Sequence, residues 1–92
     1  TEYNLALNYL DCVLLDYMAG KKDINTDCSM IKYYTSELAF RAADVCVQLF
    51  GGYGICTEVP ISRQFCDTRI MRFMGGTTET QMGVVAGGLG IK

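Results

Sequence analysis

Two glycine-rich segments are the parts of this sequence best suited to hold a ligand with main-chain atoms. The first is Gly51-Gly52-Tyr53-Gly54. Closely spaced glycines let backbone amides approach a phosphate or a flat cofactor, because no Cβ stands in the way. The segment does not fit the dinucleotide-binding fingerprint, since a helical pattern precedes it and Thr57 occupies the place of the third glycine. A turn that ends a helix is the alternative, and spacing alone favours that turn.

The second segment places the pair Gly75-Gly76 directly before Thr77-Thr78-Glu79. A threonine at this point can cap a helix, and the first amides of a helix have no partner within it. Those amides could receive an anion or a carbonyl oxygen. Spacing alone favours an ordinary turn between two helices, so the segment is a candidate site only.

Several kinds of chemistry are excluded by what the chain lacks. Histidine is absent from the 92 residues, which removes the commonest general base and the commonest zinc ligand. The carboxylates are scattered over predicted polar faces or helix caps rather than paired for acid and base catalysis. We therefore assign no catalytic residue and no metal site to these residues.

Charge and cysteine usage narrow the class of partner and the compartment. A net charge of -2 offers no basic surface, so we do not expect nucleic-acid binding. No apolar run approaches the ~18 residues of a membrane span, and the first residues do not resemble a signal peptide. The five cysteines contain no C-x-x-C pair, which favours free thiols in a reducing compartment, the cytoplasm or the mitochondrial matrix.

The elements that must position the two glycine segments are helices. A first helix is predicted up to about Gly20, because apolar residues recur at steps of four and three. We expect its buried stripe to be Tyr3, Leu7, Leu10, Leu14 and Tyr17.

A second, longer helix is predicted to end at Gly51-Gly52. Thr26 is its expected N-cap and Asp27 lies in its first turn. Glu37 and Arg41 are spaced for an ion pair one turn apart. The residues expected on its buried face are Ile31, Tyr34, Leu38, Ala42, Val45 and Leu49.

Two shorter helices complete the pattern. One covers about residues 61–73 with Pro60 in its first turn, and the last is capped by Thr77 or Thr78. Glycines weaken the last helix, so we expect fraying beyond Ala86. Strand-like alternation does not persist, and we predict an all-α, antiparallel helical bundle that forms a single domain. Its apolar stripes exceed what so short a chain covers, so the excess belongs to a partner or to other parts of a larger protein.

Taken together, the two glycine segments and the residues between them resemble the C-terminal helical domain of acyl-CoA dehydrogenases. The similarity covers residues 20–86 closely and the first helix loosely. It implies that residues 1–92 form the C-terminal part of a larger flavoenzyme, which also has an N-terminal helical domain and a middle β domain. The residues that carry the resemblance are Gln48–Gly54, Pro60, Asp67–Ile70 and Gly76–Glu79.

The resemblance implies an FAD-dependent enzyme of fatty acid metabolism that desaturates an acyl-CoA thioester between Cα and Cβ. A carboxylate removes the α proton, the β hydrogen leaves as hydride to the flavin, and an electron-transferring flavoprotein reoxidises the flavin. By resemblance, Gln48, Gly51 and Gly52 reach the adenine-side half of FAD in a neighbouring subunit of a homo-oligomer. Thr77 and Glu79 lie along the phosphates and adenine of the same cofactor. We expect that the chain alone retains no FAD and is inactive, because most cofactor contacts belong to other domains.

Gly75 departs from the pattern of many family members, which carry the catalytic glutamate at this position. Glycine cannot accept a proton, whereas other branches place that glutamate on an earlier helix, which would lie before Thr1. The amide of Gly75 can still bind substrate by donating a hydrogen bond to the thioester carbonyl. Two alternatives stay open: a non-catalytic helical interaction module derived from the fold, and a flavin-dependent relative such as an acyl-CoA oxidase or nitroalkane oxidase.

Overall fold

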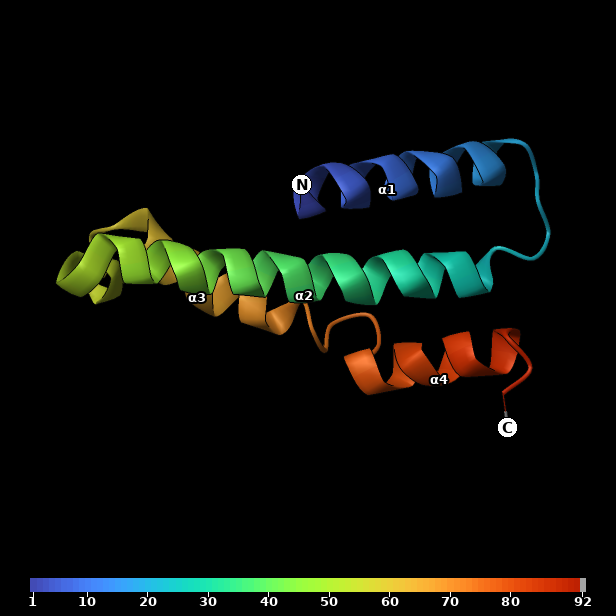
Figure 1. Ribbon diagram of the computed structural model, residues 1–92. Coiled ribbons are helices and arrows are strands. Elements are labelled where there is room, and N and C mark those ends of the chain that lie inside the picture. Colours follow the sequence, from blue (N-terminus) through green and yellow to red (C-terminus); the bar gives the residue numbers. More distant parts are fainter. Residues whose placement is uncertain (92) are drawn as a thin grey trace.

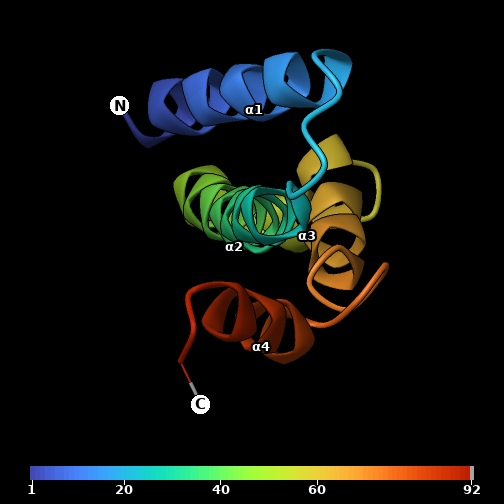
Figure 2. The same cartoon turned by 90° about the vertical axis from the view of Figure 1, so that its right-hand side faces the viewer.

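The computed structural model describes residues 1–91, and one long helix forms its centre. In Figures 1 and 2, α1 and α4 lie on two sides of the N-terminal half of α2, and α3 lies along its C-terminal half. No strand occurs within the described residues, so the predicted all-α helical bundle is confirmed. The elements are α1 (Glu2–Met18), α2 (Asn25–Phe50), the 3-10 helix η1 (Gly51–Ile55), α3 (Pro60–Ile70) and α4 (Thr78–Gly88).

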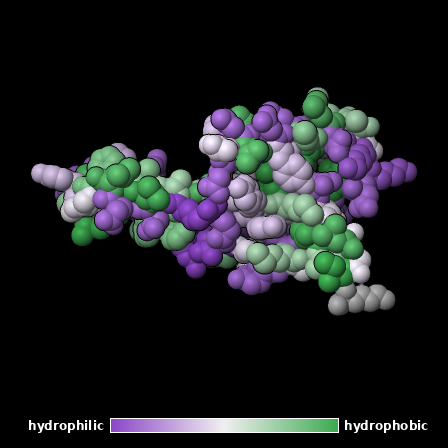
Figure 3. All heavy atoms as spheres, in the orientation of Figure 1, coloured by the Kyte–Doolittle hydropathy of each residue, from purple (hydrophilic) through white to green (hydrophobic). Residues whose placement is uncertain are grey.

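The molecule is elongated and covers little of its apolar surface. Its Cα radius of gyration is 15.7 Å, against about 12 Å for a compact chain of this length. Hydrophobic colour gathers at the narrow left end in Figure 3, around η1 and the end of α2, where Leu49 is 80% exposed. The expectation of excess apolar surface is confirmed, since the buried hydrophobic residues in the described chain are Ala6, Val13, Ile31 and Ala43.

The buried face of α1 differs from the predicted stripe. Tyr3 is 69% exposed and Tyr17 is 68% exposed, whereas Ala6 and Val13 are buried. Small side chains let two helices approach closely, so Ala6 faces α2 and the larger residues turn outward. The spacing of apolar residues identifies the apolar face of a helix. It does not indicate which residues of that face are buried by the rest of the same chain.

The buried face of α2 was predicted correctly only in part. Ile31 is buried as expected, but Ala42, Val45 and Leu49 are exposed. These three residues belong to the C-terminal half of the helix, where α3 and η1 cover one side only. α1 reaches only the beginning of this half, where Glu2 contacts Arg41, so Val45 and Leu49 stay exposed.

Two local predictions for α2 were wrong. The helix begins at Asn25 with Ile24 in the N-cap position, because the Cys28 N–H donates to the Ile24 carbonyl at 2.8 Å. Thr26 therefore lies inside the first turn and does not cap it. The expected pair within the helix does not form either, since both partners find residues of other elements. Arg41 contacts Glu2 at 3.1 Å, and Glu37 contacts Arg72 at 2.7 Å.

The ends of the shorter helices follow local signals. Pro60 opens α3, and Thr77 caps α4 by accepting a hydrogen bond from the Thr80 N–H at 3.1 Å. Both starts were predicted. α3 ends at Ile70, three residues earlier than expected, and turn residues follow. α4 continues to Gly88, past the point where we expected fraying. None of the described helices is long and apolar enough to cross a membrane.

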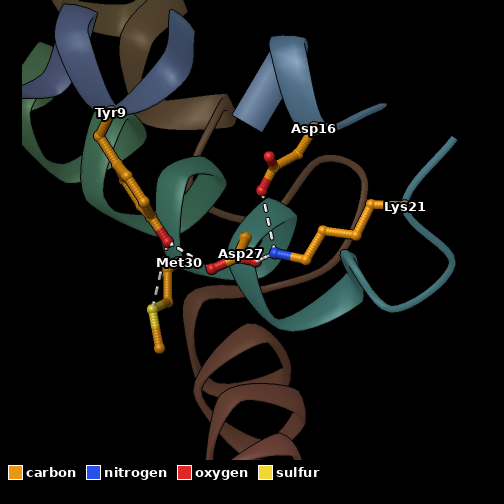
Figure 4. Close-up of polar contacts among 5 residues, drawn as sticks. All are labelled: Tyr9, Asp16, Lys21, Asp27 and Met30. Carbon is orange, nitrogen blue, oxygen red and sulfur yellow. Dashed lines mark hydrogen bonds and ion pairs between the residues drawn. The ribbon is translucent and has the colours of Figure 1, made fainter. Parts of the chain in front are cut away.

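A polar cluster fastens α1 and the loop that follows it to the first turn of α2 (Figure 4). The Tyr9 hydroxyl donates to Asp27 Oδ1 at 2.9 Å. Lys21 Nζ donates to Asp16 at 2.9 Å and to Asp27 at 3.3 Å. The bonds from Tyr9 and Lys21 outweigh partial burial and hold the pKa of Asp27 below its ordinary value. Burial and the same hydrogen bond raise the pKa of Tyr9 to about 12.

The lowered pKa of Asp27 predicts an acid-sensitive contribution to stability. A depressed pKa in the folded state stabilises the fold above the unfolded pKa, and the contribution is lost as pH falls through the folded value. Urea unfolding of the chain between pH 7 and pH 3 should therefore show a smaller fall in the unfolding midpoint for Asp27→Asn than for the unaltered chain. Asp23→Asn, which replaces an exposed acid nearby, should show the same fall in midpoint as the unaltered chain. An equal fall in midpoint for all three proteins would contradict the role of Asp27.

Candidate functional site

The segment Gly75–Glu79, called the elbow below, reverses the chain between α3 and α4. Gly75 has φ +68° and Gly76 has φ +103°, a region that side-chain-bearing residues rarely adopt. A Cβ placed on Gly75 would meet no atom within 4 Å, so the main chain here is open to another molecule. The predicted site residues Gly75, Thr77 and Glu79 thus come together at one turn.

The carbonyl groups of the two glycines are both fixed by side chains. Gln81 Nε2 donates to the Gly75 carbonyl at 3.1 Å, and Lys32 Nζ donates to the Gly76 carbonyl. A trans peptide is planar and holds its C=O and N–H in opposite directions. The N–H groups of Gly76 and Thr77 therefore point away from the two side chains that bind the preceding carbonyls.

The main-chain donors of the elbow are left for an external acceptor. Within residues 1–91, four N–H groups of the elbow have no hydrogen-bond acceptor, those of Gly75, Gly76, Thr77 and Glu79. The Thr78 N–H, in contrast, donates to the Arg72 carbonyl at 3.0 Å. The available donors are therefore those of the glycine turn, Thr77 and Glu79, and the first helical residue, Thr78, is not among them.

Glu37 of α2 ties the base of the elbow to the end of α3. Its Oε1 accepts from Arg72 Nε at 2.7 Å and from the Thr78 hydroxyl at 3.0 Å. Burial acts to raise the pKa of Glu37, but the bonds from Arg72 and Thr78, with the nearby charge of Arg69, outweigh it and lower the pKa. The carboxylate is therefore ionised at neutral pH, and it serves as an acceptor rather than an acid.

A small pocket of about 100 Å³ adjoins the elbow and is lined by two arginines, one aromatic ring, two threonines and a glutamate. The guanidinium of Arg69 lies 5.7 Å from the Phe73 ring centre and 5.9 Å from that of Phe40. Arg72 lies 5.5 Å from the same Phe40 ring. Cation–π contacts hold both arginines in place. Arg72 is paired with Glu37, so the charge that can attract an anion here is that of Arg69. The lining residues are Arg69, Arg72, Phe73, Thr77, Thr78 and Glu79.

The other predicted cluster, Gln48 with Gly51 and Gly52, lies at the far end of α2. All three residues are exposed, and a Cβ on either glycine would meet no atom within 4 Å. Gln48 follows Glu37 by eleven residues, which is close to three helical turns. The two residues therefore lie on the same face of α2, about 16 Å apart along the helix axis. The pocket beside the elbow contains none of these three residues, so the two predicted clusters do not meet there. A hollow of about 520 Å³ beside Gly54 and Phe65 contains none of the predicted site residues.

The residues that hold the elbow from behind were not predicted from the sequence. Lys32 and Glu37 lie on α2, more than 40 residues before the groups that they bind in the elbow. Glu37 adjoins Leu38 at the edge of the expected buried stripe, and that position was the available signal that it faces another element. Nothing in the sequence around Lys32 indicated that its side chain reaches another element.

Comparisons with known proteins place this architecture in one family. The family described as "Acyl-CoA dehydrogenase, C-terminal domain" matches residues 1–90. The mitochondrial long-chain specific acyl-CoA dehydrogenase of Sus scrofa is 45% identical over 58 residues, which are 63% of this chain and 14% of that protein. The caffeyl-CoA reductase-Etf complex subunit CarC of Acetobacterium woodii is 35% identical over 70 residues, 76% of this chain and 18% of that protein.

A solved structure agrees over nearly the whole fold. The crystal structure of an acyl-CoA dehydrogenase from Geobacillus kaustophilus superposes with a TM-score of 0.93 at 37% identity. The match covers 97% of this chain and 23% of that one. The chain thus spans less than a quarter of the length of the proteins that it matches here.

Proposed function

Because this chain belongs to the acyl-CoA dehydrogenase family and matches its C-terminal domain, we propose that it contributes FAD and substrate contacts to a desaturase of acyl-CoA thioesters. The observation that carries the proposal is the elbow, where four of the five main-chain N–H groups have no acceptor within residues 1–91. Arginine charge lies beside them. Such a surface suits the phosphate oxygens of a dinucleotide.

The residues of the chain fit the cofactor at two places. Thr77 and Glu79 would lie along the phosphates and adenine, beside the open main chain at Gly75 and the guanidinium of Arg69. Gln48, Gly51 and Gly52 would reach the adenine-side half of FAD held by a neighbouring subunit, and their exposure at the end of α2 is compatible with such a contact. When bound, FAD supplies the hydride acceptor for desaturation.

Gly75 is proposed to act on the substrate rather than on the cofactor. Its N–H has no acceptor among the described residues, so it can donate to the thioester carbonyl. Negative charge develops on that oxygen as the α proton leaves, and a fixed amide donor stabilises it. Gly75 has no group that accepts the proton, so we propose no catalytic base within this chain.

The proposed partners are those of a complete enzyme. They are an acyl-CoA, an electron-transferring flavoprotein, and further copies of the same protein. One relative is named as a subunit of an Etf complex, which supports the second of these. Exposed apolar faces at the end of α2 support the third, because such surfaces are normally covered by protein. A mitochondrial relative supports a compartment in which the five thiols stay free.

The function is tested on a full-length protein that contains this chain. The purified protein should carry FAD and desaturate an acyl-CoA with an artificial electron acceptor. Gln48→Ala should raise the FAD dissociation constant about threefold to tenfold, the loss expected for one hydrogen bond. Gln64→Ala, at an exposed glutamine on α3, is the matched control and should bind FAD normally. Because one relative is named a reductase, the assay is run in both directions.

The non-catalytic interaction module is the second candidate. The resemblance implies that Gly75 stands where many family members carry the catalytic glutamate, which favours a packing role. The large exposed apolar faces favour it as well. A full-length protein that associates with itself but takes up no FAD would support the module and contradict the enzyme.

A further inference from the structure

We propose that Lys32 and Gln81 are positioning residues that aim the N–H groups of Thr77 and Gly76 at the anionic part of FAD. The inference rests on the proposed function and adds two residues to it. Lys32 binds the Gly76 carbonyl and Gln81 binds the Gly75 carbonyl. Neither side chain needs to touch the cofactor, because each acts through one planar peptide group.

Two consecutive glycines make this anchoring necessary. Glycine adopts positive and negative φ with similar ease, so a Gly-Gly turn does not by itself fix the direction of its peptide planes. A peptide that turned over would present its carbonyl oxygen where the N–H now lies, and it would repel a phosphate. Turning over would also break the bond from Lys32 or from Gln81. The two side chains therefore favour the orientation that attracts an anion.

Lys32 adds charge as well as orientation. Its ammonium binds a neutral carbonyl, and no acid lies within ion-pair distance of it in residues 1–91. The side chain is partly buried behind the elbow, so its positive charge is incompletely screened. Gln81 is neutral, so its loss changes only the orientation of a peptide plane. Loss of Lys32 changes the orientation and also removes a positive charge.

The test measures FAD binding to the full-length protein by flavin fluorescence during reconstitution of the apoprotein. Lys32→Met keeps the length of the side chain and loses its donor and charge, and it should raise the FAD dissociation constant about tenfold. Gln81→Leu should raise it about threefold. Lys32→Arg restores a charged donor and should stay within about twofold of the unaltered protein. The control is Lys22→Met, at an exposed lysine in the loop before α2.

A purely structural role predicts a different pattern, in which the variants lower the urea midpoint while folded protein binds FAD normally. That result, or normal FAD binding by both Lys32→Met and Gln81→Leu, would overturn the positioning role and leave the proposed function intact. An unaltered full-length protein that binds no FAD would overturn both. A tenfold loss in Lys32→Met with rescue by Lys32→Arg, and an unchanged KM for acyl-CoA, would support the inference.

Discussion

Gly54→Ala is expected to lower the free energy of unfolding of this chain by about 1–3 kcal/mol. A Cβ on Gly54 would lie 2.6 Å from the Val47 carbonyl oxygen and 3.1 Å from Val47 Cγ1. The nearer atom is main chain of α2, so it cannot rotate away, and η1 would have to separate from the helix. Because η1 leads into α3, the loss should spread to that contact as well.

Urea unfolding followed by far-UV circular dichroism measures the effect at one fixed protein concentration. Gly52→Ala is the matched control, since a Cβ there would meet no atom within 4 Å. Its free energy of unfolding should change by less than about 0.5 kcal/mol. If Gly54→Ala were as stable as Gly52→Ala, the close packing of η1 against Val47 would be wrong.

Substitution of two glycines of α4 by alanine is expected to change stability in opposite directions. A Cβ on Gly88 would overlap the Thr26 hydroxyl, and Thr26 Cγ2 lies at 3.0 Å, so rotation of the threonine brings no relief. Gly88→Ala should therefore destabilise the chain by about 1–3 kcal/mol. Gly83 has open space around it, and Gly83→Ala should stabilise the helix by up to about 1 kcal/mol.

The same unfolding experiment separates packing from helix propensity. Thr26→Ala combined with Gly88→Ala removes the overlapping hydroxyl and should recover part of the loss. If both alanine variants stabilised the chain equally, the contact between the end of α4 and the start of α2 would be contradicted. Thr26, which was expected to cap α2, would then have no structural partner in α4.

The helix ends were predictable from sequence because their signals are local. Pro60 and the Thr77 cap act within one or two turns, and the structure places helix starts at both. The buried faces were not equally predictable. Tyr3 and Leu49 belong to regular apolar patterns, yet both are exposed, because the pattern does not distinguish a face covered by the same chain from one covered by another surface.

In the candidate site, too, the local features were predictable from the sequence and the long-range contacts were not. The glycine pair and Thr77 mark the elbow in the sequence, since a reversal between helices needs such residues. The side chains that orient it come from far along the chain, Lys32 across 44 residues and Glu37 across 41. A single sequence gives no measure of such contacts, and a nearer arginine offered Glu37 a partner that the folded chain does not use.

The distribution of donors and acceptors at the elbow has a consequence for selectivity. Both glycine carbonyls already accept a hydrogen bond from a side chain, while the neighbouring amides remain available. A ligand that presents oxygen lone pairs finds partners here, and an amine or an ammonium finds few. The turn therefore discriminates by the polarity of the hydrogen bond, before shape or size is considered.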